Sequence, residues 1–238
     1  MACHLRSTSL PSRPLASEAE VEQELHSLEA SISSSATIST ICGALRMLGN
    51  IYNGVEEIIC LPSNQVSSSA SLLKMLDGEM GCSFELLDLC STMQEIFVEL
   101  KTIIQDLQVA LRKGDDAAVQ AKIQSYTRLA KKAKKHFKKI CNKAASGKAE
   151  CGMVRLLTKA RELTVSLLES TLHLLSKQIE MPKQSLVSKA FHKKKAAIFE
   201  EEQLQELECS MGDLESEAGH LFRKLVQNRV SLLNILSS

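Results

Sequence analysis

Apolar side chains recur every three or four residues over most of this 238-residue chain. In the most regular stretch the interval alternates between four and three residues without a miss, at Leu86, Cys90, Met93, Phe97, Leu100, Ile104, Leu107 and Leu111. A spacing of about 3.5 residues is typical of helices that pack nearly parallel or antiparallel at about 20°. At about 1.5 Å per residue, the stretch predicts a helix of roughly 39 Å.

The same periodicity predicts further helices on both sides of this stretch. Their expected ranges are 18–30, 37–60, 116–145 and 150–179, with a short turn of helix at 72–76 and a short basic helix at 183–197 that joins a last long helix through Leu232. Pro62 and Pro182 end two of these helices, because proline cannot continue a helix.

These stripes predict an all-α fold, a bundle of long antiparallel helices, with 18–238 as one domain and 1–17 as a flexible tail of Ser, Pro and Arg. The short connections favour a bundle over a parallel coiled-coil dimer, because each helix has a neighbour in its own chain. Composition agrees with this prediction. Aromatic residues make up only 3% and Trp is absent, which disfavours sheets. The 44% share of apolar residues suffices for a core.

Hydropathy and cysteine spacing further narrow the class of protein to which this chain can belong. No uncharged apolar run approaches the roughly 18 residues of a membrane span, so we expect no transmembrane segment. The most apolar stretch, 163–175, contains Glu169 and His173. The eight cysteines lack a Cys-x-x-Cys pair, and Cys82 and Cys90 are too far apart on a helix to chelate one metal ion. We expect reduced thiols in an intracellular protein and no zinc.

Charge is separated into two blocks. Residues 117–149 contain ten lysines and arginines and no acid, whereas 200–217 contain eight acids and no base. Six of the bases are Lys131, Lys132, Lys134, Lys135, Lys138 and Lys139. On a helix these six, here called the lysine face, span about 60° to 220° from Phe137, while Ala130 and Ala133 lie beside Phe137. The apolar stripe is therefore expected to face inwards and the lysine face outwards.

Three interpretations of the lysine face follow. The first is purely structural: the lysines form a solvated face whose charge is balanced by the acidic last helix. Each exposed ion pair would stabilise the fold by only about 0–1 kcal/mol. The functional one is a docking surface for an acidic protein or an anionic membrane leaflet, where each lysine is worth about 1 kcal/mol. Nucleic acid is not expected, because aromatic residues are not interleaved and arginine is scarce.

The N-terminal tail contains a second candidate site. Arg6, Ser7, Ser9 and Pro11 fit the pattern Arg-Ser-x-Ser-x-Pro. An arginine three residues before a serine suits basophilic kinases, and phosphorylated Ser9 followed by Pro11 is similar to ligands of 14-3-3 proteins. We therefore predict a phosphosite and a 14-3-3 partner here. A transit peptide shares this basic, serine-rich composition, so plastid import stays open.

The residues offer no catalytic constellation. The ten glycines are scattered, without a phosphate-binding loop, and the six histidines do not pair with acids or cysteines at helical spacing. His136 lies at the margin of the lysine face and His173 lies among leucines. We therefore expect no enzymatic activity, no catalytic residues and no cofactor.

Several segments in this order resemble a plant-specific family of unknown function that includes, or is related to, the BYPASS-type proteins. They are His4-Leu5-Arg6-Ser7-Thr8-Ser9-Leu10-Pro11-Ser12-Arg13-Pro14, Leu61-Pro62-Ser63, Leu86-Leu87-Asp88-Leu89-Cys90, Lys131-Lys132-Ala133-Lys134-Lys135 and Arg229-Val230-Ser231-Leu232-Leu233-Asn234-Ile235-Leu236-Ser237. The resemblance covers essentially the whole chain, and the two termini are its most specific parts.

The resemblance implies a helical, intracellular protein without known enzymatic activity. Better-known relatives are linked to root and shoot development through control of a root-derived mobile signal, and some to the exocyst and secretion. The family has no established catalytic or ligand residues to carry over. We therefore expect a non-enzymatic adaptor or regulator, cytoplasmic or peripheral to a membrane. The alternative is a membrane- or exocyst-associated protein that docks through its lysine face.

Overall fold

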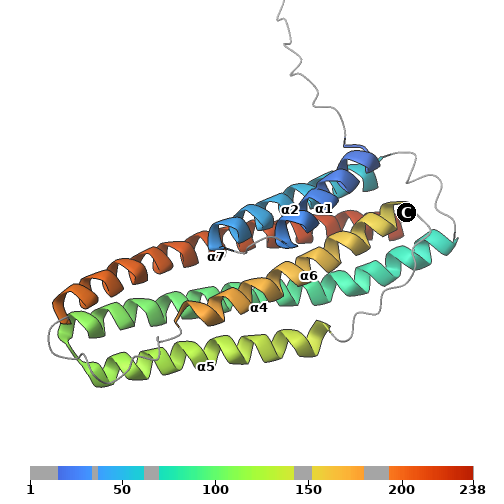
Figure 1. Ribbon diagram of the computed structural model, residues 1–238. Coiled ribbons are helices and arrows are strands. Elements are labelled where there is room, and N and C mark those ends of the chain that lie inside the picture. Colours follow the sequence, from blue (N-terminus) through green and yellow to red (C-terminus); the bar gives the residue numbers. More distant parts are fainter. Residues whose placement is uncertain (1–15, 34–36, 62–69, 142–151, 180–192, 238) are drawn as a thin grey trace, which may run out of the picture.

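The computed structural model describes residues 16–33, 37–61, 70–141, 152–179 and 193–237, and within them all regular structure is helical. The helices are α1 (Glu18–Ser33), α2 (Ile38–Ile59), α4 (Ala70–Lys113), α5 (Asp116–Cys141), α6 (Gly152–Gln178) and α7 (Lys193–Leu236). Figure 1 shows the helices side by side, with their long axes roughly aligned. The predicted all-α bundle is therefore confirmed.

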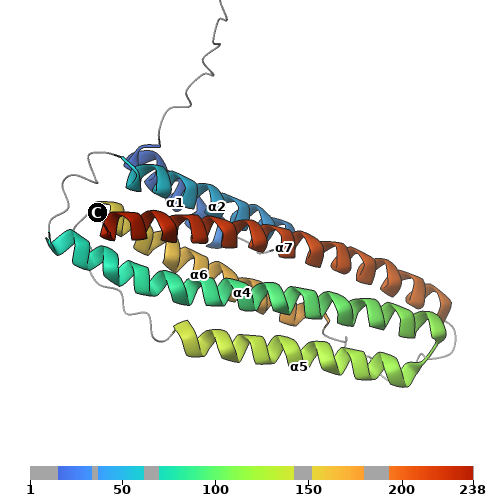
Figure 2. The same ribbon diagram turned by 180° about the vertical axis from the view of Figure 1, so that it is seen from behind.

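Four of the helices form the centre of the bundle. Around it, α4 packs against α7, α7 against α2, α2 against α6, and α6 against α4. The two remaining helices are additions on the α6 side, since α1 packs against α2 and α6, and α5 packs against α4 and α6. Figures 1 and 2 both show α5 at the outer edge of the molecule, with α4 between it and α7.

Side-chain contacts give the directions of neighbouring helices. Along α7, Glu208 accepts from Gln105 of α4 and Arg229 donates to Ser83 of α4, so these two helices run antiparallel as predicted. In contrast, α2 and α7 run in parallel, because α7 residues pair with α2 residues in rising order on both helices. The pairs are Arg46 with Glu217, Asn53 with Lys224, and Glu56 with Ser231.

The predicted stripes form the core. Of the eight apolar positions between 86 and 111, seven are buried to 3% exposure or less, and Leu111 at the helix end is half-buried. The stripes of α2, α6 and α7 join them in one apolar cluster. Burying each such side chain stabilises the fold by roughly 1.5–3 kcal/mol, which explains why the periodicity predicts the architecture.

Two helices are longer than their patterns predicted. The turn at 72–76 and the stripe that begins at Leu86 belong to one 44-residue helix, α4. Gly78 and Gly81 cost roughly 1 kcal/mol each within it, yet Leu76 and Met80 continue the buried stripe and offset that cost. Residues 193–197, predicted to end a separate basic helix, are the first residues of α7. The rest of that predicted helix lies outside the described residues.

The turn between α4 and α5 determines where the basic helix lies. Gly114 has φ 67°, a left-handed conformation that favours glycine, and its N–H donates to Leu111 O at 3.1 Å. Asp115 then caps α5, with its Oδ1 accepting from the Ala118 N–H at 3.0 Å. This tight turn folds α5 back along α4 and leaves its outer side at the edge of the bundle.

Candidate functional site

The inner side of α5 fastens the basic helix to the bundle. Tyr126, Ala130, Ala133 and Phe137 are all buried to 4% exposure or less, as the stripe predicted. The Tyr126 hydroxyl donates to Leu175 O of α6 at 3.0 Å, and its burial raises the pKa of the phenol well above its ordinary value. The inner side therefore belongs to the core and is not free for a ligand.

The outer side of α5 presents the lysine face. Lys131, Lys132 and Lys135 are exposed, and Lys134 is half-buried with its Nζ 3.1 Å from His173 Nδ1 of α6. Among the residues that the structure describes, none of the ion pairs involves these four lysines. The side chains of Lys138, Lys139 and His136 lie outside the described part of the chain.

The positive charge at and beside this face affects the pKa of His173. Lys177 first, and then Lys134, lower the pKa of the exposed imidazole below its ordinary value. The neutral ring can then accept a hydrogen bond from the Lys134 ammonium through Nδ1. Lys134 of the face thus adds to the positive field of Lys177 at this histidine, which suits a surface that attracts anions.

Within the described residues, the acidic block of α7 does not pair with the lysine face. Its described charge partners lie on α2 and α4: Glu217 pairs with Arg46, Glu215 with Lys101 at 3.7 Å, and Glu201 with Arg112 at 2.6 Å. Glu208 accepts from two amides of α4, at 2.7 Å from Gln105 and 3.1 Å from Gln108.

The expectation that the acidic last helix meets the lysine face is therefore wrong for the described lysines. The physical reason is topological: the Gly114 turn places α5 in the groove between α4 and α6, whereas α7 lies on the other side of α4. Among the described side chains, α5 makes its ion pair with α4, between Lys122 and Asp106 at 2.6 Å.

Sequence reasoning missed a buried polar cluster where α2, α4, α6 and α7 meet. Arg161 of α6 is 8% exposed and lies 3.4 Å from the carboxylate of Glu79, which also accepts from Thr158 at 2.8 Å. Nearby, the Tyr52 hydroxyl lies 3.2 Å from Thr164 Oγ1, and Asn228 donates to Tyr52 O at 2.7 Å.

This cluster encloses a cavity of only about 20 Å³ and therefore offers no room for a substrate. Its signal in the sequence was weak. Asn228 interrupts the last apolar stripe, but Arg161 and Glu79 look like ordinary charged positions of amphipathic helices.

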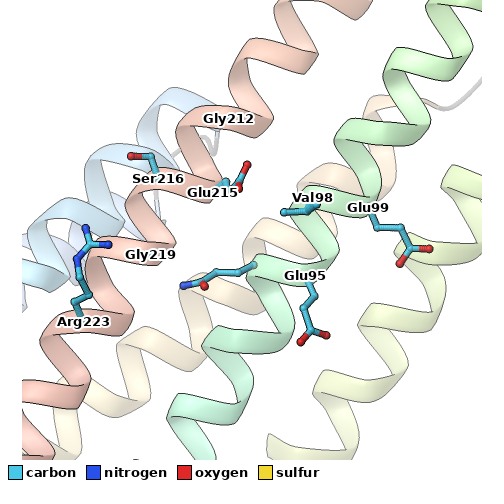
Figure 3. A pocket seen from close by; sticks show the side chains of 9 residues that line it. Glu95, Val98, Glu99, Gly212, Glu215, Ser216, Gly219 and Arg223 are labelled. Carbon is cyan, nitrogen blue, oxygen red and sulfur yellow. The ribbon is translucent and has the colours of Figure 1, made fainter.

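Two open grooves flank α7. The larger, of about 680 Å³, lies between α4 and α7 and is lined by Gln94, Glu95, Val98, Glu99, Gly212, Glu215, Ser216, Gly219 and Arg223 (Figure 3). The other, of about 460 Å³, lies between α2 and α7 and contains Cys42. Burial first, and then Asp213 and Glu217, raise the pKa of the Cys42 thiol to about 11, so it is a poor nucleophile at neutral pH.

The structure describes only some of the residues on which the remaining sequence predictions rest. Arg6, Ser7, Ser9 and Pro11 lie outside the described residues, so their predicted phosphosite stays a prediction. Of the described cysteines, Cys90 is buried, whereas Cys60 and Cys209 are exposed. Within the described segments, no helix is long and apolar enough to cross a membrane. In the same segments, no three His, Cys, Asp or Glu residues are grouped to hold a metal ion.

Comparison with known proteins identifies the family. The model of a family described as Protein BPS1 matches residues 44–235, from within α2 almost to the end of α7. Searches of curated proteins and of solved structures gave no match. Because the matched range covers most of the chain, this protein belongs to the BPS1 family, in agreement with its resemblance to the BYPASS-type plant proteins.

Proposed function

We propose that this protein is a non-enzymatic adaptor or regulator in plant development, and that it binds an acidic protein partner through the lysine face of α5. Membership of the BPS1 family supports the developmental setting. One observation carries the docking surface: Lys131, Lys132 and Lys135 are exposed and make no ion pair with any described residue, while the acidic block is engaged elsewhere.

The energetics favour an outside partner for these lysines. Like charges three and four residues apart on a helix destabilise it by about 0.2–0.5 kcal/mol per pair, and an acidic ligand would relieve that repulsion. Complementary charge also steers association and raises its rate. A lysine face on the outermost helix can be reached without opening the core, because the stripe behind it stays packed against α4 and α6.

A second candidate function is peripheral association with an anionic membrane through the same face. The support is the residue type: lysines dominate the face, and about 1 kcal/mol per lysine is expected near an anionic leaflet. The apolar residues of α5 are buried in the bundle, so binding would be electrostatic and without insertion into lipid.

Two assays with one variant test these proposals. Replacing Lys131, Lys132, Lys134 and Lys135 with Gln removes the described charges of the face. The full chain and this variant are then used for affinity capture from plant root extract and for co-sedimentation with phosphatidylserine and phosphoinositide liposomes at low salt.

The adaptor proposal predicts acidic proteins that are captured by the full chain and lost with the variant, and capture unchanged by the variant would contradict it. The membrane alternative fails if the full chain ignores anionic liposomes at low salt. Liposome binding without any captured protein would favour the membrane alternative over the adaptor.

A further inference from the structure

The two sides of the four-helix centre differ in what covers them. The grooves on either side of α6 are occupied by added helices, α1 against α2 and α6, and α5 against α4 and α6. The grooves on either side of α7 carry no such helix among the described elements, and both are open. The outward face of α7 is therefore the part of the centre that is left bare.

Between Cys209 and Val230 that face combines small and apolar residues with the exposed charges of Asp213 and Arg223. Gly212, Ser216 and Gly219 line the groove toward α4. Beyond them on α7, Val226 is 38% and Val230 is 50% exposed, and Val98 of α4 is 48% exposed at the groove. Figure 3 shows Val98 pointing toward α7, while Glu95 and Glu99 point away from it. The charged α7 residues that line this groove are Glu215, whose partly exposed carboxylate also lies 3.7 Å from Lys101 of α4, and Arg223.

Packing among the described residues does not require glycine at either of the two groove positions. A Cβ on Gly212 would meet its nearest neighbour, Lys101 Nζ, at 3.7 Å, and one on Gly219 would meet Arg223 Nη1 at 3.7 Å, both ordinary contacts. By contrast, a Cβ on Gly49 would lie 2.9 Å from the His220 ring, so a side chain at that position would force the ring to shift. Glycine is a poor helix former, and an alanine at 212 or 219 would strengthen the free helix.

The groove also contains an unmet hydrogen-bond donor. The side-chain nitrogen of Gln94 is buried beside the groove and has no hydrogen-bond partner among the described residues, and it lies 3.9 Å from where a Cβ of Gly219 would be. Close packing of a helix against this groove would explain the two glycines.

We propose that the occupant is a second copy of this chain, with α7 packed antiparallel on α7 about a two-fold axis near Gly219. In such an isologous pair, residues whose numbers are symmetric about 219 lie opposite each other. Arg223 of each copy then faces Glu215 of the other, and Val226 of each copy faces Gly212 of the other. Because the pair is symmetric, the contact between Arg223 and Glu215 and the contact between Val226 and Gly212 each occur twice.

The charge pattern selects a second copy over other occupants. Glu215 and Arg223 lie on opposite sides of Gly219 at equal spacing, so the face is complementary to itself when it is turned around. An acidic or a basic foreign helix would leave one of these two charges opposed by a like charge. The lysine face of α5 stays outside this interface, since α4 separates α5 from α7.

Charge reversal tests the register. The oligomeric state of the full chain is measured by sedimentation equilibrium between about 1 and 100 µM, and a dimer is expected. Arg223→Glu places like charges opposite each other at two symmetric contacts and should raise the dissociation constant at least tenfold. Adding Glu215→Arg to Arg223→Glu swaps the charges and should restore the constant to within about threefold of the original. Arg128→Glu, an equal charge reversal on exposed α5, is the control and should change nothing.

A second variant separates dimerisation from folding. Gly212→Ala with Gly219→Ala should leave the melting temperature of the diluted monomer equal or higher, while the dimer dissociates at least tenfold more readily. A chain that stays monomeric at 100 µM, as it would if residues 1–15 or a foreign helix filled the groove, overturns the proposal. A dimer that tolerates Arg223→Glu also overturns it.

Discussion

The lysine face of α5 and the acidic block of α7 are similar in sequence and opposite in structure. Both are runs of one charge on an amphipathic helix. Four acids of α7, Glu201, Glu208, Glu215 and Glu217, contact cations or amides on the neighbouring helices α2 and α4. The exposed lysines of α5 meet no described acid. The difference teaches that opposite charge blocks in one chain need not pair, because topology decides which helices become neighbours before surface charges can.

The two blocks also differ in what their charges can do. Each ion pair of α7 is partly exposed and worth at most about 1 kcal/mol, yet together they match α7 to its neighbours. The lysines of α5 contribute little to the fold and remain available to a partner. Substitutions of charges inside the bundle should therefore cost more stability than substitutions of charges on its outer surface.

The largest effect is expected where a charge pair is enclosed. Arg161→Met leaves the Glu79 carboxylate without its cation, which should cost about 3–5 kcal/mol in the free energy of unfolding. Guanidinium unfolding followed by circular dichroism measures this loss. The matched control is Arg155→Met on the same helix, where the exposed pair with Glu22 should cost no more than about 1 kcal/mol. Equal costs would show that burial does not govern the value of these charges.

A smaller effect is expected within the acidic block. Glu208→Ala removes the acceptor of Gln108, a side chain that is only 7% exposed, and should cost about 1–3 kcal/mol because the amide is left buried and unpaired. Glu206→Ala, at an exposed position of the same block, should stay within about 0.5 kcal/mol. Urea unfolding of the two variants compares them. If Glu206→Ala were the more costly change, the assignment of Glu208 to the α4 contact would be wrong.

Removing charge from α5 should leave the fold almost untouched. Replacing Lys131, Lys132 and Lys135 with Gln should change the free energy of unfolding by no more than about 0.5 kcal/mol, with any change toward greater stability as repulsion is relieved. Thermal unfolding in low and high salt provides the measurement. A loss above about 1 kcal/mol would mean that these lysines have an internal partner after all.

The smallest effect concerns the proton on His173. Its pKa lies below the ordinary value, so acid favours the unfolded chain slightly once pH falls below about 6.5, and stability is fully present above that pH. Lys177→Met should raise the pKa of His173 more than Lys134→Met does, because Lys177 is the stronger cause. Titration of the imidazole protons by NMR checks the order. A reversed order would place the dominant charge on α5 instead of α6.

Local patterns were good guides to the elements and poor guides to their neighbours. The stripe from Leu86 to Leu107 predicted burial correctly, because the 3.5-residue period has one physical solution, a helix with one side in the core. The break assumed between 76 and 86 was wrong, because Gly78 and Gly81 lower helix propensity without removing the buried side chains that outweigh it.

Only part of the candidate site could be predicted from the sequence. Helical angles alone placed Lys131, Lys132 and Lys135 on the outer side of their helix, and the structure agrees. That Glu217 would contact Arg46 across 171 positions has no local signal. The same holds for the Arg161 pair with Glu79 and for the open groove beside Gly219, because each depends on which helices share a boundary.

By itself, the sequence determined that this protein is a helical bundle, which side of each long helix is buried, and that α5 presents lysines outward. These properties follow from periodicity, because they depend only on which side of a single helix is apolar and which side is exposed to water. Only the tertiary structure decided that the acids of α7 are engaged by α2 and α4, that α4 separates them from the lysine face, and that the outer side of α7 stays open. Those properties depend on the Gly114 turn and on the order of helices around the core, which no single helix contains.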